Sequence, residues 1–151
     1  MTLVVPFDGS ELAEAALVRG AEFGTVFDEG VVAVTVIPER NTNYARERGW
    51  IGQEESFDID AIVSTLRDRV AERCPDAEFE HVVVDRHAPS GTIARAIRSL
   101  ARNRDASMVF VGSDNAGHFV SSVSTVGGNV ASDDAYDVVI VRTPISAKRT
   151  E

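Results

Sequence analysis

The chain has 151 residues, which suits one domain over 1–151, and its 44% apolar and 26% charged residues exclude a disordered composition. No apolar run is long enough to span a membrane and no signal peptide is visible, so we expect a cytoplasmic protein without a membrane partner. The 24 acidic residues outnumber the 15 basic ones, and a surface of that sign repels nucleic acid.

The basic residues are almost all arginine, since Lys148 is the single lysine. An acid-rich, lysine-poor composition resembles that of proteins from halophilic organisms, where roughly 1 M salt shortens the reach of electrostatic repulsion to about 3 Å. The alternative is a compositional bias without physical consequence. If the halophilic interpretation holds, stability rises from low to molar salt.

The first part of the chain predicts two strands around a helix. The apolar run 2–7 ends at the turn and helix-cap residues 8–10, which is typical of a buried strand. Apolar residues then return at helical spacing up to about residue 28. Residues 31–37 are β-branched and apolar on both faces, as a strand covered by helices on both sides requires.

The segment 38–57 is polar and has no apolar period, so we expect a long mobile loop. Helical spacing resumes at Ile59 and ends at Cys74, because the following Pro75 disfavours further helix. Residues 79–84 predict a third strand with charged flanks, which indicates an edge strand.

The same alternation continues to the end of the chain. In order, we expect a helix over 90–102, a strand over 108–111, a turn-rich loop over 112–117, a helix over 119–130, a strand over 138–141 and a polar tail over 143–151.

Alternating strands and helices favour right-handed crossovers, and so predict an α/β fold: an open, doubly wound, parallel five-stranded sheet with helices on both faces. In such sheets, ligands bind at the carboxyl ends of the strands where the winding reverses. Here those ends are the loops after the first and fourth strands. We therefore expect Asp8 and Gly112 to face one cleft.

Three motifs together resemble the universal stress protein family: Pro6-Phe7-Asp8-Gly9-Ser10, His87-Ala88-Pro89 and Val111-Gly112-Ser113. The resemblance covers nearly the whole chain. It implies an adenine nucleotide alpha hydrolase-like fold with strand order 3-2-1-4-5. It also implies a homodimer formed through the final strand, at Val138, Val139, Ile140 and Val141.

The resemblance further implies a nucleotide-type cleft. Its ligand-binding positions in this chain are Pro6, Asp8, Val36, Gly112, Asn115, Gly117, Ser124 and Thr125. In nucleotide-binding members of the family, the positions of Asp8 and Val36 lie beside the adenine, and a glycine-rich loop after the fourth strand holds the phosphates.

That phosphate loop departs from the family pattern. Gly112 matches the first glycine, but Asn115 stands at the second glycine position and Ser124 at the third. Glycine permits positive φ and close approach of phosphate oxygens to the backbone, and serine does not. Asp114 adds a negative charge beside the loop. The motif is therefore degraded.

The resemblance implies a non-enzymatic stress-response protein in which any ATP hydrolysis is slow and incidental. With a degraded motif we expect ATP binding to be weak or lost. The alternative is that Gly117 and the pair 127–128 form a shifted glycine pattern that binds ATP or AMP with Mg²⁺. A third reading is a receiver-type phosphoacceptor domain with Asp85 as the acceptor.

Other chemistry has little support in the sequence. His81, His87 and His118 lack partners at ligand spacing, so we expect no metal centre. Cys74 is the single cysteine, which excludes an intrachain disulfide and favours a reducing compartment. The common nucleotide-loop and hydrolase motifs are absent.

Overall fold

The computed structural model describes residues 1–114, 119 and 136–145, and strands and helices alternate along them. The elements are β1 (Thr2–Pro6), α1 (Glu11–Phe27), β2 (Gly30–Pro38), α2 (Thr42–Glu47), α3 (Ile59–Arg73), β3 (Glu78–Val84), α4 (Ser90–Asn103), β4 (Ala106–Gly112) and β5 (Asp137–Val141). The strands expected from the sequence are confirmed to within a few residues. The helix expected after Phe119 and the tail beyond Ile145 lie outside the described residues.

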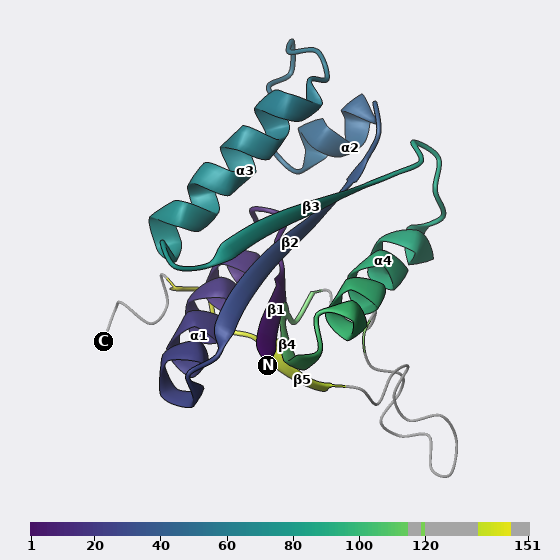
Figure 1. The fold of residues 1–151 in the computed structure, drawn as a ribbon. Helices are drawn as coiled ribbons and strands as arrows, with labels where there is room; N and C mark the ends of the chain where they lie inside the picture. Colours follow the sequence, from purple (N-terminus) through teal and green to yellow (C-terminus); the bar gives the residue numbers. More distant parts are fainter. Residues whose placement is uncertain (115–118, 120–135, 146–151) are drawn as a thin grey trace.

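The strands form one sheet in the order β3-β2-β1-β4-β5, and every neighbouring pair is parallel (Figure 1). This confirms the predicted doubly wound sheet, the strand order and the edge position of β3. Parallel pairing also brings the carboxyl ends of all the strands to one side of the sheet. Pro6 at the end of β1 thus pairs with Val34 in β2.

The strand order contradicts the receiver-type alternative. A receiver domain has the flavodoxin-like order 2-1-3-4-5, in which the strand carrying the acceptor lies next to the first strand. Here β2 separates β3 from β1. The strand that precedes Asp85 is therefore not adjacent to β1, the strand that precedes Asp8.

Helices cover both faces of the sheet, with α1 and α3 on one side and α4 on the other (Figure 1). Successive side chains of a strand point to opposite faces, so β1 contributes Leu3 and Val5 to the core beneath α1 and α3, and Val4 to the core beneath α4. All three are fully buried. A sheet covered in this way requires the continuous apolar strands seen in the sequence.

The turn after β1 starts α1 at a defined point. Gly9 has a φ of 84°, a conformation that glycine adopts without a steric penalty. The Ser10 side chain accepts a hydrogen bond from the backbone N–H of Ala13 at 3.2 Å and so caps the helix. The first turn carries Glu11 and Glu14, which the positive end of the helix dipole favours.

The expected long mobile loop over 38–57 needs correction, because the segment contains α2 and packs against the core. Ala45, Trp50 and Ile51 are buried within the core beneath α1 and α3. A helix of six residues is too short to show an apolar period, which is why the sequence pattern did not reveal it. The Asn41 side chain caps this helix by accepting from the N–H of Tyr44 at 3.1 Å.

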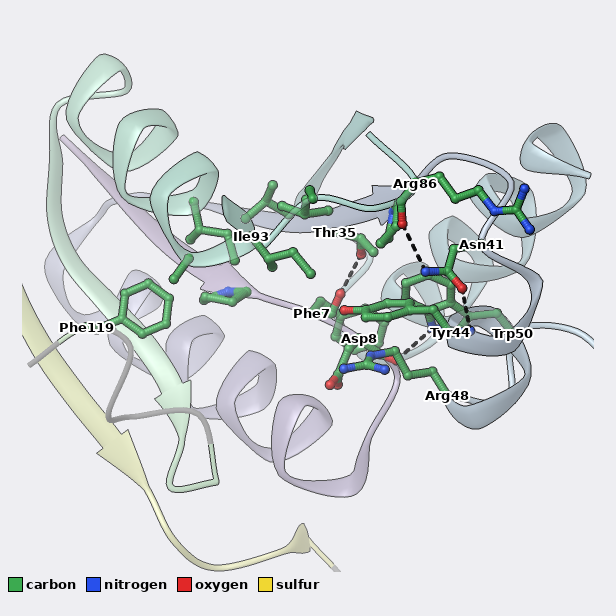
Figure 2. A pocket seen from close by; sticks show the side chains of 17 residues that line it. Phe7, Asp8, Thr35, Asn41, Tyr44, Arg48, Trp50, Arg86, Ile93 and Phe119 are labelled. Carbon is green, nitrogen blue, oxygen red and sulfur yellow. Dashed lines mark hydrogen bonds between the residues drawn. The ribbon is translucent and has the colours of Figure 1, made fainter. Parts of the chain in front are cut away.

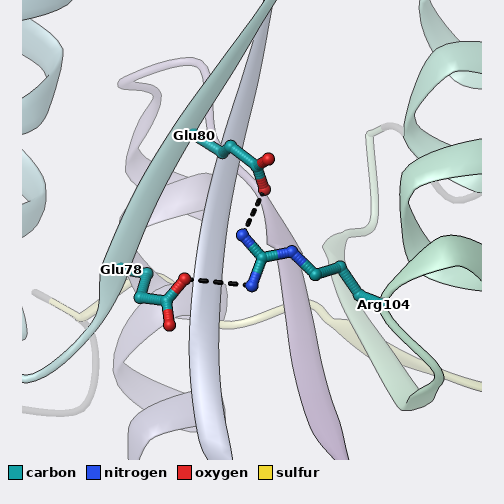
Figure 3. A network of polar contacts seen from close by, with 3 residues as sticks. All are labelled: Glu78, Glu80 and Arg104. Carbon is teal, nitrogen blue, oxygen red and sulfur yellow. Dashed lines mark hydrogen bonds and ion pairs between the residues drawn. The ribbon is translucent and has the colours of Figure 1, made fainter.

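The edge strand β3 is tied to the turn after α4 by one arginine (Figure 3). Arg104 donates to Glu78 at 3.0 Å and to Glu80 at 2.7 Å. These two hydrogen bonds raise the pKa of Arg104. The contact joins the polar face of β3 to the start of β4.

Among the described helices, none has both the length and the hydropathy needed to cross a bilayer.

Candidate functional site

A cleft with a volume of about 360 Å³ opens at the carboxyl ends of β1 and β2 (Figure 2). Small-molecule sites in proteins start at about 300 Å³. The described residues that line it are Pro6, Phe7, Asp8, Val34, Thr35, Val36, Pro38, Asn41, Tyr44, Arg48, Trp50, Arg86, Ala88, Ile93, Ala94, Ile97 and Phe119. The cleft lies at the edge of the sheet where doubly wound folds bind their ligands.

The structure brings together three of the residues expected at the site, since Pro6, Asp8 and Val36 all line the cleft. Pro6 is the last residue of β1, Asp8 follows two residues later, and Val36 lies in the neighbouring strand β2. Their side chains come from two adjacent parallel strands, which explains how residues 30 positions apart meet at one cavity.

Gly112 lies at the end of β4 and is buried, but it is not among the residues lining the cleft. A Cβ at this position would lie 2.8 Å from the Cβ of Leu12 and 2.8 Å from Oδ1 of Asp114. Close packing of β4 against the start of α1 therefore explains the glycine by itself. The other expected site residues, Asn115, Gly117, Ser124 and Thr125, lie outside the described residues.

The tip of β1 is held by side chains from distant parts of the chain. The Thr35 hydroxyl donates to the carbonyl oxygen of Phe7, and Trp50 Nε1 donates to the carbonyl oxygen of Asp8 at 2.9 Å. Oδ1 of Asp8 accepts from the N–H of Ser10 at 3.0 Å. The second carboxylate oxygen has no donor within the described part of the chain, so it remains available to a ligand.

One wall of the cleft consists of aromatic residues from α2 and the turn after it. The rings of Tyr44 and Trp50 meet edge to face, with centroids 5.6 Å apart. Arg48 covers the Tyr44 ring, with its Cζ 3.5 Å from the centroid. Burial raises the pKa of Tyr44; the nearby Arg48 lowers this pKa and Asp8 raises it further. The Tyr44 hydroxyl therefore stays protonated and can donate.

A second contact ties this wall to the loop after β3. Asn41 accepts from the Tyr44 N–H through its side-chain oxygen and donates through Nδ2 to the carbonyl oxygen of Arg86 at 3.1 Å. One asparagine thus joins the start of α2 to the loop after β3 (Figure 2).

Sequence reasoning missed the whole of this wall. The cleft residues that it did not propose include Thr35, Asn41, Tyr44, Arg48, Trp50 and Arg86. A signal was present, because a tyrosine and the only tryptophan of the chain occur in a segment that is otherwise polar. Large aromatic side chains carry much apolar area and are usually buried, with their polar atoms hydrogen-bonded.

The lining of the cleft combines charged, aromatic and apolar groups. Within the described residues, no cluster of three or more histidine, cysteine, aspartate or glutamate side chains could hold a metal ion. Cys74 is buried in the core and does not line the cleft. Burial also raises the pKa of its thiol. The lining offers a carboxylate, guanidinium groups, aromatic rings and apolar surface.

Comparisons with known proteins agree with this fold. The profile of the universal stress protein family matches residues 1–142. No curated protein sequence matches the chain significantly. A universal stress protein solved in complex with cAMP is 26% identical, with a TM-score of 0.57, and the match covers 95% of this chain and 97% of that one.

Two further solved structures share the fold at lower identity. The universal stress protein UspA from Lactobacillus plantarum is 15% identical, with a TM-score of 0.56 over 94% of this chain and 97% of that one. The universal stress protein from Archaeoglobus fulgidus in complex with dAMP is 19% identical, with a TM-score of 0.53 over 94% and 98%. The parallel sheet with order 3-2-1-4-5 is the expected adenine nucleotide alpha hydrolase-like fold. With its family profile matched over residues 1–142, the chain belongs to the universal stress protein family.

Proposed function

We propose that this chain is a non-enzymatic stress-response protein whose cleft binds an adenine nucleotide carrying a single phosphate, such as AMP or cyclic AMP, more tightly than ATP. The observation that carries the proposal is that Pro6, Asp8 and Val36, three of the ligand-binding positions that the family resemblance implies, line one cleft. The 26% identical relative solved with cAMP supports a ligand of this class.

The cleft offers the two kinds of surface that an adenosine group needs. Val34, Val36 and Ile93 supply apolar side chains against which a flat base can pack. The available carboxylate oxygen of Asp8 can accept a hydrogen bond from a ribose hydroxyl or an amino group.

The preference for one phosphate over three rests on the loop after β4. Asn115 and Ser124 stand where the family pattern has glycines, and Asp114 adds a negative charge. Asp114 disfavours a chain of phosphates more than a single one, because repulsion grows with ligand charge. The two lost glycines remove positions at which phosphate oxygens can approach the backbone closely, and three phosphates need more such positions than one does. A shifted glycine pattern that binds ATP with Mg²⁺ is the alternative that the same experiment tests.

The test is a titration of nucleotide-free protein with AMP, cyclic AMP and ATP plus Mg²⁺ by calorimetry, after any retained nucleotide has been released and identified by mass. Trp50 is the single tryptophan and lines the cleft, so its fluorescence reports binding independently. We expect AMP or cyclic AMP to bind more tightly than ATP. Tighter binding of ATP would establish the alternative, and no binding of any nucleotide would refute the proposal.

A matched pair of variants locates the site. Asp8→Asn removes the carboxylate charge at the cleft, and Asp68→Asn removes the same charge from an exposed position on α3. We expect Asp8→Asn to weaken the binding of adenosine, which has no phosphate, about tenfold, because an amide oxygen accepts a weaker hydrogen bond than a charged carboxylate does. Asp68→Asn should leave the affinity unchanged.

The absence of catalysis is part of the same proposal. Among the described lining residues there is no serine, cysteine, histidine or lysine, and the Thr35 hydroxyl is already bonded to the Phe7 carbonyl. No nucleophile with an adjacent base is therefore evident in this part of the cleft. Incubation with ATP and Mg²⁺ should release ADP only slowly. Saturable turnover above about 1 per second, within the ordinary enzyme range, would refute this.

We also propose a homodimer formed through β5. This strand is at the edge of the sheet and presents Ile140, which is 44% exposed, beside Val138 and Val139. An exposed apolar edge strand favours pairing with a second copy. Light scattering should give a dimer, and Ile140→Lys should give a monomer. Val26→Lys, at a residue 76% exposed on α1, is the control that should stay dimeric.

Finally, we propose that the acidic composition, with 24 acidic against 15 basic residues, reflects adaptation to a halophilic environment. High salt screens repulsion among surface carboxylates, so the folded state is most stable there.

A further inference from the structure

Tyr44 in α2 presents its hydroxyl end to the cleft. Arg48 covers one face of the ring, with its Cζ 3.5 Å from the centroid, and Trp50 packs against the ring edge to face at 5.6 Å. The side chain lines the cleft, and Figure 2 shows it reaching from α2 toward Phe7 and Asp8. A ligand in the cleft therefore meets the hydroxyl end of this ring.

The Tyr44 hydroxyl is an unused hydrogen-bond donor. Asn41 accepts from the backbone N–H of Tyr44, but the hydroxyl forms no hydrogen bond with residues 1–114, 119 and 136–145. It is not among the fully buried polar atoms of these residues that lack a partner, so it is open to the cleft. Burial raises the pKa of Tyr44 despite the opposing charge of Arg48, and the charge of Asp8 raises it further. The hydroxyl keeps its proton at neutral pH and can donate.

Asp8 supplies a matching acceptor. One of its carboxylate oxygens accepts from the N–H of Ser10 at 3.0 Å, and the other has no donor within the described part of the chain. Asp8 also lies close enough to the Tyr44 hydroxyl to act on it electrostatically, without a hydrogen bond between the two groups. The cleft thus holds one available acceptor near one available donor.

One edge of adenine is complementary to this pair. Its amino group donates, and the ring nitrogen on either side of that group, N1 or N7, accepts. A 6-oxopurine such as hypoxanthine has an acceptor oxygen in place of the amino group, and this oxygen would face the carboxylate of Asp8. A ribose hydroxyl both donates and accepts, so it does not require a donor and an acceptor side by side.

We infer that Tyr44 is a specificity-determining residue of the cleft: it donates to the ring nitrogen beside the amino group of adenine, while Asp8 accepts from that amino group. The inference rests on the proposed function and adds a residue of α2 to the base-binding part of the site. It concerns the base alone, so it is independent of where the phosphate lies.

The test uses four nucleoside monophosphates that differ only in the base: AMP, 1-deaza-AMP, 7-deaza-AMP and IMP, whose base is hypoxanthine. Calorimetry would be run on the wild type, Tyr44→Phe and Tyr136→Phe. Tyr136 is the other tyrosine of the chain and does not line the cleft. We expect Tyr44→Phe to weaken AMP binding about three- to tenfold, as for one lost hydrogen bond. Tyr136→Phe should leave AMP binding unchanged, and circular dichroism would establish that both variants are folded.

The two deaza analogues separate a hydrogen bond from a structural role. Each has a C–H group in place of N1 or N7, so one of them lacks the atom that accepts from Tyr44. That analogue should bind the wild type about three- to tenfold more weakly than AMP does, and Tyr44→Phe should weaken it no further. IMP should bind the wild type at least about tenfold more weakly than AMP, because its oxygen faces the carboxylate of Asp8.

Equal weakening of AMP and both deaza analogues by Tyr44→Phe would show that Tyr44 only supports the wall, and would overturn the inference. An unchanged AMP affinity in that variant would overturn it as well. So would IMP binding as tight as that of AMP, because the pair would then hold a group that both share, such as the ribose. In all three cases the wild type still binds AMP, and the proposed function stands. A wild type that binds no AMP would instead refute the proposed function, and the inference with it.

Discussion

Trp50 and Asp8 are 42 positions apart in the sequence and share a hydrogen bond of 2.9 Å from the indole Nε1 to the backbone carbonyl oxygen. This bond joins the segment after β2 to the tip of β1, where the candidate ligand site begins. Trp50 is only 6% exposed, so its indole N–H cannot easily exchange this bond for one with water.

Replacement of Trp50 by phenylalanine should destabilise the fold. The variant keeps an aromatic ring but removes the indole N–H, so the carbonyl oxygen of Asp8 loses its hydrogen-bond donor. We expect the free energy of unfolding to fall by about 1–3 kcal/mol, the cost of an unsatisfied buried polar group. Urea unfolding followed by circular dichroism measures it. Phe27→Leu, at a half-exposed position on α1, should change it by less than about 0.5 kcal/mol. An unchanged midpoint for Trp50→Phe would show that the bond contributes nothing.

Gly112 gives a test of whether packing alone requires a glycine at the end of β4. In Gly112→Ala the new Cβ would meet Leu12 and Asp114 at 2.8 Å, so the backbone must shift. We expect a loss of about 1–3 kcal/mol, as for other overpacked sites. Gly91→Ala is the control, because a Cβ there meets no atom within 4 Å and the residue is helical. It should be neutral or stabilising by up to about 1 kcal/mol. Equal effects of the two changes would argue against the packing explanation.

The raised pKa of Tyr44 predicts a loss of stability at alkaline pH. Burial is the main cause; Asp8 adds to it and Arg48 opposes it. The unfolded chain ionises near the ordinary value of 10.0, while the folded protein keeps the proton to higher pH. The contribution of the protonated Tyr44 to the stability of the fold is therefore complete below pH 10.0. It is lost as the pH rises toward the pKa of Tyr44 in the folded protein. Between about pH 9 and pH 11, Tyr44→Phe should lose less stability than the wild type. Urea unfolding at several pH values measures this. Equal losses of the free energy of unfolding in the wild type and in Tyr44→Phe over this pH range would contradict the prediction.

The contacts of Arg104 with Glu78 and Glu80 should contribute little to stability. The two glutamate side chains are 65% and 40% exposed, and water screens exposed ion pairs. Arg104→Gln should lower the free energy of unfolding by about 0.2–1 kcal/mol per pair in dilute buffer, and by less in about 1 M salt. A loss well above that range, unchanged by salt, would mean that these contacts fix the edge of the sheet.

Salt should stabilise the whole protein even though it weakens that ion pair. Screening reduces the mutual repulsion of the excess acidic residues, which raises the stability of the folded protein. The same screening weakens the ion pairs of Arg104, which lowers the stability slightly. We expect Tm to rise as potassium chloride increases from a low concentration to about 1 M. Sucrose is the control, since it stabilises by exclusion and leaves charges unscreened. A Tm independent of salt would remove the halophilic interpretation.

The predictions that held depend on local patterns. The apolar strand 2–7, the cap at Ser10 and the end of α3 before Pro75 follow from the properties of neighbouring residues, and the structure confirms each of them. The strand order came from the family resemblance, and the structure confirms it as well.

One prediction that failed, the long mobile loop over 38–57, depends on contacts between distant residues. Six residues of α2 are too few to show a period, and the two large aromatic residues were the one local sign that this segment is packed. Trp50 and Tyr44 are the residues that place this segment against the tip of β1. Another prediction, that Gly112 faces the same cleft as Asp8, failed because Gly112 is packed against Leu12 and does not line the cleft.

The sequence by itself determined the alternation of strands and helices, the parallel sheet and the position of Asp8 at the end of a strand, because helical and strand periods and turn residues act over a few neighbours. Only the tertiary structure decided which side chains surround Asp8, and that Arg48 lies on Tyr44 without an acidic partner in the described chain. Those contacts arise when the sheet brings distant segments to one edge, and no local pattern specifies which side chains then meet.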